Sequence, residues 1–468
     1  MRVTLLACMS ALLLAAGGCG GDSTTSAAGG DPGAAALVPA DVVAFVSLNT
    51  DRDSDQVEQL REVANRFPIA RDGLDRLLRE LTAEDELTWN EDVEPAVGDE
   101  VAFAVLAGHD GVVGLTQPDD PAKLDALLST TDVEVETREV EGWHVFGEPG
   151  DLDAFEAARG GDTLDDSDAY ADAFDDLADE ALAKFYASGA ALEGLSEQFG
   201  TPVEGAGSFD TAGVVFEAVD DGIRVDGRAT GVEGLPAAFE PELLGRVPDD
   251  AFLAISFSGL DELLSDLRSG SIPFLPDVEQ ALGVTLDELG AVFSGEGVLY
   301  ARSGVPIPEV TLAVRPENPA GALATLRKLA ETLAGVTGSS VQRTEVDGVQ
   351  VEYLEIEGVR VQLASVDGTV IVTTGIAGIR DFRADDDKLT GSDEFESAAD
   401  AAGFEEHTNG LFYVNFAEAL PVIEGLAGLA GEPLPTEVRE NLEPLRTLFV
   451  HGHAADGEVR FSGVLETG

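Results

Sequence analysis

Basic residues are the scarcest charged class in this chain of 468 residues. Lys and Arg together number 27 against 90 Asp and Glu, which gives a formal net charge of −63 at pH 7. A field of that sign repels phosphate backbones and anionic headgroups, so nucleic-acid binding and a polybasic grip on a membrane are both excluded. Hydrophobic residues nevertheless make up 44% of the chain, which predicts a folded protein rather than an acidic disordered tail.

Cysteine is nearly absent, and the positions of the two cysteines, Cys8 and Cys19, are informative. Cys8 lies in an apolar stretch that follows Arg2 and is too short to span a bilayer, which takes about 20 residues. This pattern predicts a signal peptide over residues 1–18. Its removal leaves one cysteine, so no internal disulfide can form and the fold must be held by its core.

Small residues immediately before Cys19 resemble a bacterial lipobox, although Ala16 stands where leucine is usual. The resemblance implies cleavage before Cys19 and a lipid on its sulfur. Residues 19–36 are rich in Gly, Ser, Thr and Ala, and we expect them to form a flexible tether. The protein is therefore expected at the cell membrane, lipid-anchored and facing the extracellular or periplasmic side. The alternative is an ordinary secretory peptide that leaves Cys19 as a free thiol.

Segments of the first half of the chain recur in the same order in the second half. The segment 37–50 (LVPADVVAFVSLNT) matches 246–259 (RVPDDAFLAISFSG). Further pairs follow in the same order: 87–103 with 284–300, 112–128 with 309–326, 138–145 with 344–351, 165–174 with 390–399, 184–195 with 411–426 and 214–227 with 449–463. Because chance does not place so many pairs in one order, the pattern predicts two tandem homologous repeats. They cover residues 37–231 and 245–468 and are joined by a connector over 232–244.

Each repeat mixes strand and helix patterns. Alternating apolar runs predict strands, while Pro121 and Pro319 each stand at the start of a helical pattern. The stretch 341–374 carries Asp-Gly and Glu-Gly turns, which predicts a four-stranded meander; the first repeat shortens it, and the alignment places the missing residues after Val145. We predict an α+β fold of mostly antiparallel sheets covered by helices on one side. Whether the repeats form separate lobes or share a continuous sheet is left open.

A family resemblance rests on the segment VPADVVAFVSLNTD, the polar helix that ends in NRFP, and the strand VGDEVAFAV. Together they resemble bacterial lipoproteins known only as a domain-of-unknown-function family, DUF 3352. The likeness spans most of the mature chain. It implies an architecture, and it brings no activity, cofactor or catalytic residue with it.

Asp51, Asp53 and Asp55 have the spacing of the first ligands of an EF-hand calcium loop, and a glutamate stands in the twelfth place. These three aspartates are the candidate metal ligands. The loop needs glycine at its sixth position for a sharp turn, and Gln56 stands there. The alternative is a connection between a strand and a helix, in which a residue of 53–55 caps the helix.

His451 and His453 lie two apart on a predicted strand and therefore on one face. The repeat alignment places Phe216 and Ala218 at the equivalent positions, so we interpret this as a packing face. The sequence contains neither Gly-x-Ser-x-Gly nor Ser-x-x-Lys, and no cofactor is expected.

These observations favour a membrane-anchored binding or envelope-associated protein without catalytic activity, whose ligand or envelope partner the sequence does not name. Two alternatives stay open. One is an envelope hydrolase that uses acidic residues, although carboxylates are too plentiful for a catalytic pair to be chosen by spacing. The other is a structural or adhesion protein that depends on divalent cations.

Overall fold

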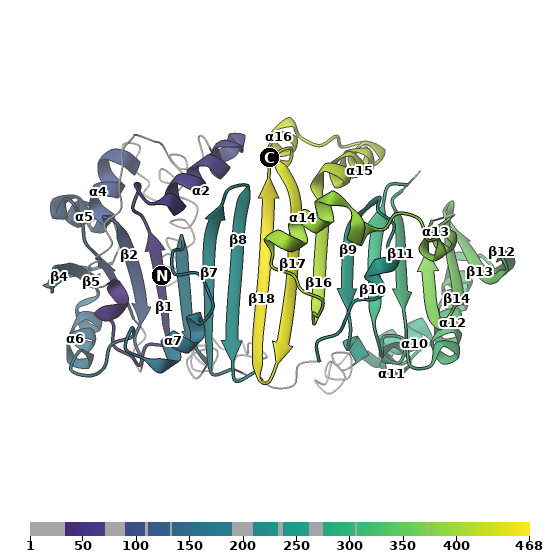
Figure 1. Cartoon of the computed structure of the whole chain (residues 1–468), viewed down its shortest axis with the longest axis horizontal. Coiled ribbons are helices and arrows are strands. Elements are labelled where there is room, and N and C mark those ends of the chain that lie inside the picture. Colours follow the sequence, from purple (N-terminus) through teal and green to yellow (C-terminus); the bar gives the residue numbers. More distant parts are fainter. Residues whose placement is uncertain are drawn as a thin grey trace.

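A computed structural model of the chain describes residues 33–70, 89–107, 111–131, 133–189, 209–232, 237–261, 275–304, 307–375 and 377–468. These residues form one continuous sheet of 18 strands that runs the length of the molecule (Figure 1). Neighbouring strands are antiparallel throughout the sheet. The two halves of the chain therefore share one sheet and are not separate lobes.

The strands of the first half follow a fixed order from the outer edge of the sheet to its middle. That order is β4 (Glu136–Val140), β5 (Trp143–Gly147), β3 (Val112–Thr116), β2 (Glu100–Val105), β1 (Ala44–Asn49), β6 (Ala183–Ser188), β7 (Thr211–Val219) and β8 (Gly222–Thr230). The strand β1 thus lies inside its half, between β2 and β6.

The second half repeats this order from its own edge to the middle and adds one hairpin at the edge. Its strands are β12 (Gln342–Val346), β13 (Val349–Ile356), β14 (Val359–Val366), β15 (Thr369–Thr373), β11 (Glu309–Val314), β10 (Gly297–Arg302), β9 (Ala251–Phe257), β16 (Gly410–Asn415), β17 (Leu445–Ala455) and β18 (Glu458–Thr467). The meander predicted over 341–374 is the run β12 to β15.

The outer hairpins correct the alignment of the two halves. β5 pairs with β3 and β15 pairs with β11, so the hairpin β4–β5 occupies the place of β14–β15. The sequence alignment instead matches 138–145 with 344–351, which form β12 and β13 at the far edge. Similar hairpins with Asp-Gly or Glu-Gly turns cannot be distinguished by pattern, because only the pairing with β3 or β11 tells them apart.

The halves meet where β8 pairs with β18, and this junction is close to symmetric. Asp226 lies directly opposite Ser462, and each is the fifth residue of its strand. Val215 lies opposite Asp226 on β7, as His451 lies opposite Ser462 on β17. An approximate two-fold axis normal to the sheet therefore passes between Asp226 and Ser462.

Alternation along the strands gives the sheet two faces, and both are covered by helices. Face A carries Phe45 in the first half and Phe449 in the second, each within a buried cluster that includes helix residues. Face B carries Val46 and Leu363 in two further clusters. The expectation of helices on one side is therefore wrong. The near-continuous burial of strands such as β2 is the pattern of a sheet buried on both faces.

The helices divide between the faces as follows. On face A lie η1 (Ala34–Ala36), α6 (Pro149–Ala158), α7 (Asp168–Phe174), η3 (Leu244–Arg246), α13 (Gly378–Arg383), η4 (Leu389–Gly391) and α14 (Asp393–Ala401). On face B lie η2 (Trp89–Val93), α4 (Glu94–Val97), α5 (Pro121–Leu128) and α12 (Pro319–Thr337), the last packed against α10 (Leu275–Leu282) and α11 (Leu286–Gly290). Pro121 and Pro319 stand in the first turn of their helices, as predicted.

Three remaining helices lie near the middle of the sheet. α2 (Asp55–Asn65) packs against β7 and β8, and α15 (Phe416–Ala430) packs against β17; α16 (Thr436–Leu442) follows α15. Arg66, at the end of α2, donates to the carbonyl and hydroxyl oxygens of Thr467 on β18, each at 2.7 Å. This contact ties the first half to the end of the second.

Each half also holds a short helical turn in place with a partly buried glutamate. Glu100 accepts a hydrogen bond from the backbone N–H of Ala34, and Glu296 accepts one from Leu243, just before η3. Ala34 is fully buried and lies in η1, so the prediction of a flexible tether over 19–36 is wrong for Ala34–Ala36. The sequence alignment misses the pair Glu100 and Glu296 because it sets Glu100 against Gly297.

Candidate functional site

Charged side chains gather on face A at the junction of the two halves. Strand alternation directs every second residue of β7, β8, β18 and β17 to this face, and α7 ends beside it. We call this set the central charged surface. It comprises Asp175, Asp176, Glu217, Arg224, Asp226, Arg228, His451, His453, Glu458, Arg460 and Ser462.

Ion pairs cross the junction between the halves. Arg228 on β8 contacts Glu458 on β18 at 2.8 Å and Asp175 at 2.9 Å. Arg460 lies directly opposite Arg228 and contacts Asp176 of the first half at 3.1 Å. Glu458 also accepts a hydrogen bond from Arg460, so one carboxylate bridges two arginines that would otherwise repel each other.

The arginines change the acidity of Glu458. Burial alone would raise the pKa of this carboxyl, but hydrogen bonds from Arg460 and Arg228 outweigh burial and lower the pKa. The ionised form of Glu458 is therefore favoured in the folded protein.

Glu217 and Asp226 form a pair of neighbouring carboxyl groups. Burial raises the pKa of Glu217, and the charge and hydrogen bond of Asp226 raise it further, while Arg224 opposes the change. Asp226 is buried and contacts Arg224 at 2.6 Å. The protonated form of Glu217 is therefore favoured relative to a free carboxyl group.

Three buried polar atoms of this surface have no hydrogen-bond partner among the described residues. They are Arg228 Nε, His451 Nδ1 and Ser462 Oγ, which come from three neighbouring strands. Buried polar atoms are normally satisfied, so such a group marks a place where a further contact can form. The cluster lies on the two-fold axis and draws on both halves.

The two histidines point to face A, and the structure corrects their predicted equivalents. His451 corresponds to Val215 and His453 to Glu217, whereas Phe216 faces the other side of the sheet. The two terminal hairpins turn at equivalent places, Asp220–Asp221 and Asp456–Gly457, but the first Asp-Gly pair stands one residue later, at 221–222, and the sequence alignment superimposed the Asp-Gly pairs instead. The interpretation as a packing face fits His451, whose ring packs against that of Phe449 with the two ring centroids 6.0 Å apart.

The candidate metal ligands Asp51, Asp53 and Asp55 lie between β1 and α2, where the structure provides a cap. Ser54 is the N-cap, and its hydroxyl accepts the backbone N–H of Val57 at 3.3 Å. The Asp51 carboxylate accepts the backbone N–H of Asp53 at 2.9 Å. Within the described parts of the chain, no three His, Cys, Asp or Glu side chains come together in a way that could hold a metal ion. Calcium binding at this loop stays a prediction.

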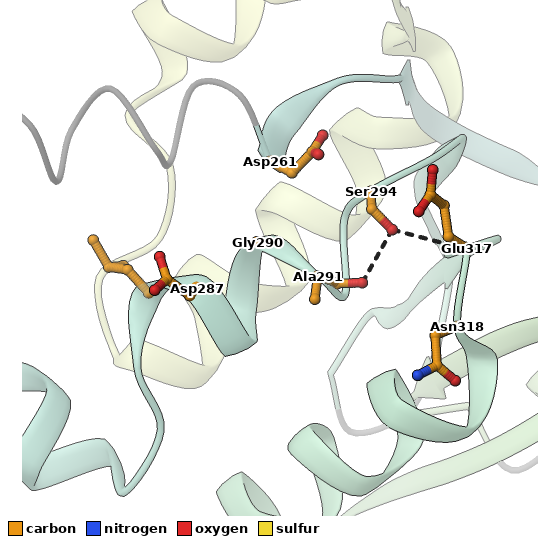
Figure 2. A pocket seen from close by; sticks show the side chains of 8 residues that line it. Asp261, Asp287, Gly290, Ala291, Ser294, Glu317 and Asn318 are labelled. Carbon is orange, nitrogen blue, oxygen red and sulfur yellow. Dashed lines mark hydrogen bonds between the residues drawn. The ribbon is translucent and has the colours of Figure 1, made fainter.

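A second polar region is a pocket of about 340 Å³ between α11 and the start of α12 (Figure 2). Its lining includes the carboxylates of Asp261, Asp287 and Glu317. Ser294 joins its walls, because it donates to the carbonyl of Ala291 at 3.2 Å and accepts the N–H of Glu317 at 3.1 Å. These bonds shape the loops of one half only, so the pocket draws on no residue of the first half.

Cys19, the predicted lipidation site, lies outside the described residues, as does the signal peptide over 1–18. No helix within the described parts of the chain is both long and apolar enough to cross a membrane.

Comparison with protein families gives a match over residues 3–142 and 153–462, to the family described as "Protein of unknown function (DUF3352)". This chain belongs to that family. The match covers most of both halves, including β7, β8 and β17 and the first five residues of β18. Comparison with curated proteins gives no match.

Solved structures give only weak likenesses to this member of the family. Crystal form IV of TP0453 is 16% identical, with 47% of this chain and 79% of that chain covered and a TM-score of 0.27. Crystal form I of TP0453 is 14% identical, with 50% and 80% covered and a TM-score of 0.27. Likenesses at these TM-scores support no conclusion about the function of this family member.

The central charged surface was not predicted from the sequence. Its arginines and carboxylates stand in β8 and β18 at alternate positions, and that alternation was visible. The pairing of β8 with β18 was not, because strands of different repeats carry no local signal of contact.

Proposed function

We propose that this protein is a membrane-anchored extracytoplasmic lipoprotein that binds its ligand on the central charged surface and performs no catalysis. The anchor is the lipid on Cys19, after removal of residues 1–18. The lipobox-like residues before Cys19 support this part of the proposal. The protein is then held at the cell membrane without any need for basic residues.

The observation that carries the binding role is the cluster of unsatisfied polar atoms at the junction. Arg228 Nε offers a donor, His451 Nδ1 an acceptor in the neutral ring, and Ser462 Oγ either. These atoms are closed to solvent, so a ligand that presents both donors and acceptors completes these bonds once a covering side chain moves aside. The nearby ion pairs hold the side chains in place, so the surface is organised before the ligand arrives.

We further propose that the two halves arose by duplication of one unit. The common strand order, the equivalent positions of Asp226 and Ser462, and the matching roles of Glu100 and Glu296 support this. A duplicated unit explains why the candidate site lies on the axis, since only there do equivalent strands meet.

The binding role can be tested with a photo-crosslinking amino acid placed at Arg460 of the full-length protein in its native membrane. We expect irradiation to add mass to the protein, measured by intact-protein mass spectrometry, because Arg460 borders the unsatisfied atoms. The matched control places the same amino acid at Arg343, an exposed strand arginine at the far edge. Equal adducts at both positions, or none at Arg460, would contradict the proposal.

The anchor has a separate test. Cys19→Ser is expected to abolish metabolic labelling with a radioactive fatty acid and to release the protein into the soluble fraction. Cys8→Ser is the matched control and is expected to leave both unchanged. Membrane retention of Cys19→Ser would refute the anchor without bearing on the binding surface.

One specific observation favours the hydrolase alternative, namely the neighbouring carboxyl groups of Glu217 and Asp226. Glu217, whose pKa is raised, lies beside the buried Asp226, and a general acid needs a raised pKa of this kind. Chromogenic glycosides and esters offered to the purified protein test this role, with Glu217→Gln as the inactive variant. Hydrolysis by the wild type that Glu217→Gln loses would replace binding by catalysis as the function of this surface.

A further inference from the structure

The chain leaves helix α14 through a tight corner, residues Ala402–Phe404, which we call the α14 corner. Figure 1 shows α14 crossing the sheet in front of β16 and β17. Gly403 adopts a left-handed conformation with φ of +65°, and the N–H of Phe404 returns to the carbonyl of Ala399 at 2.9 Å. This is a common way to end a helix, and it turns the carbonyl of Ala402 away from the helix.

His451 on β17 holds the α14 corner against the sheet. Its Nε2 lies 3.1 Å from the carbonyl oxygen of Ala402. A carbonyl oxygen only accepts, so Nε2 carries the proton and, in the neutral ring, Nδ1 carries the lone pair. The ring also packs edge to face against Phe404, with centroids 5.3 Å apart.

The groups around Nδ1, on the other side of the ring, do little to stabilise a positive charge there. Nδ1 is buried and has no hydrogen-bond partner among the described residues. The neighbouring strand β18 presents Ser462, β16 presents Leu411, and the corner itself presents Phe404. The charged and titratable groups that act on the ring are Asp226 and Arg224 on β8 and His453 on β17.

We propose that His451 is a proton-sensitive latch: the neutral ring holds the α14 corner closed, and protonation at mildly acidic pH releases it. In the open state the Ala402 carbonyl is solvated, and the rings of Phe404 and Phe449 become accessible beside the central charged surface. The latch does not depend on the identity of the ligand or on the lipid anchor.

The direction of the pH effect, opening on acidification, follows from the burial of the His451 ring. Burial lowers the pKa of His451 below its usual value, and the hydrogen bond that Nε2 donates to the Ala402 carbonyl and the charge of Asp226 only partly oppose this. The closed state therefore binds its proton less well than the open state does. As pH falls below about 6.5, the ordinary histidine pKa, protons favour the open state.

Hydrogen exchange of the full-length protein, followed by mass spectrometry at pH 7.5 and 5.5, tests the latch. After correction for intrinsic exchange, we expect opening of peptides from α14 and its corner to rise at pH 5.5, by up to about tenfold. That factor is the upper limit, which applies to a group with pKa near 6.5 in the open state that stays fully neutral when closed. Peptides from β13 and β14, far from the junction, report any general effect of acid.

His451→Gln keeps a donor for the Ala402 carbonyl but cannot titrate, so its corner should exchange equally at both pH values. His451→Phe is a second variant that keeps the aromatic packing if the glutamine variant does not fold. His144→Gln, which changes a histidine on β5 of the first half, is the matched control and should keep the wild-type response. A response unchanged in His451→Gln or His451→Phe, or no response in the wild type, would overturn the proposal.

Discussion

Replacing Arg228 with methionine should weaken the junction of the two halves. Methionine keeps most of the apolar stem and removes the guanidinium that joins β8 to β18. The Arg228 side chain is only 11% exposed, while its partners Glu458 and Asp175 are 28% and 62% exposed. The variant therefore removes a nearly buried cation and leaves behind two carboxylates of different exposure.

The exposures set the magnitude of the effect. Removing one member of a fully buried ion pair costs 3–5 kcal/mol, and an exposed pair contributes at most about 1 kcal/mol. Asp175 returns largely to water, and Glu458 keeps its hydrogen bond from Arg460. We therefore expect Arg228→Met to lower the free energy of unfolding by about 2 kcal/mol, between those limits.

Urea unfolding with two probes measures the change. Both tryptophans, Trp89 and Trp143, lie in the first half, so fluorescence reports that half, while far-UV circular dichroism reports both. Because one sheet spans the halves, the two transitions should coincide in the wild type. Arg228→Met should shift the fluorescence transition to lower urea.

The matched control is Arg343→Met on the edge strand β12. The Arg343 side chain is 74% exposed, and its partner Glu352 keeps a second arginine, Arg327. We expect a change below about 0.5 kcal/mol there. Equal effects of Arg228→Met and Arg343→Met would refute the reasoning that the ion pair across the junction contributes to stability.

Three further predictions concern acid, packing and capping. The pKa of Glu458 is lowered in the folded state, so the contribution of this carboxylate to stability is present above its unfolded pKa and is lost as pH falls through its folded pKa. In a plot of unfolding free energy against pH, Glu458→Gln should therefore make the decline on the acid side less steep. At Gly227 an added Cβ would lie 2.1 Å from a ring carbon of Phe461 on the paired strand, so Gly227→Val should lower the melting temperature. The double variant Gly227→Val with Phe461→Ala should regain part of that loss, because the clashing ring is gone. A double variant that melts no higher than Gly227→Val would contradict the clash. Ser54→Ala should cost about 1 kcal/mol in urea unfolding, whereas Ser167→Ala, at an N-cap without a side-chain hydrogen bond, should cost much less; equal losses would speak against the cap.

Much of the fold could be predicted from local pattern. The four-stranded meander, the helices that begin at Pro121 and Pro319, and the terminal hairpins at Asp221 and Asp456 all follow from turn residues and periodicity. Turn chemistry and alternation act over a few residues, so they are visible in one sequence.

Other features depend on residues far apart in the chain. The sidedness of the helices was predicted wrongly, because strands that are buried on both faces show only that something covers each face. The match of the outer hairpins was also wrong, since β4–β5 and β12–β13 have the same local pattern. The capping role of Glu100 toward Ala34 spans 66 residues and has no local signal.

The sequence by itself determined that this is a very acidic, cysteine-poor protein with a two-part repeated pattern, because composition and periodicity are properties of the chain alone. Its membership of a family without known activity also follows from the sequence. Only the tertiary structure decided that β8 pairs with β18. That pairing places Arg228, Glu458, Ser462 and His451 together on one face, because side chains from different halves meet only when their strands share a ladder of hydrogen bonds.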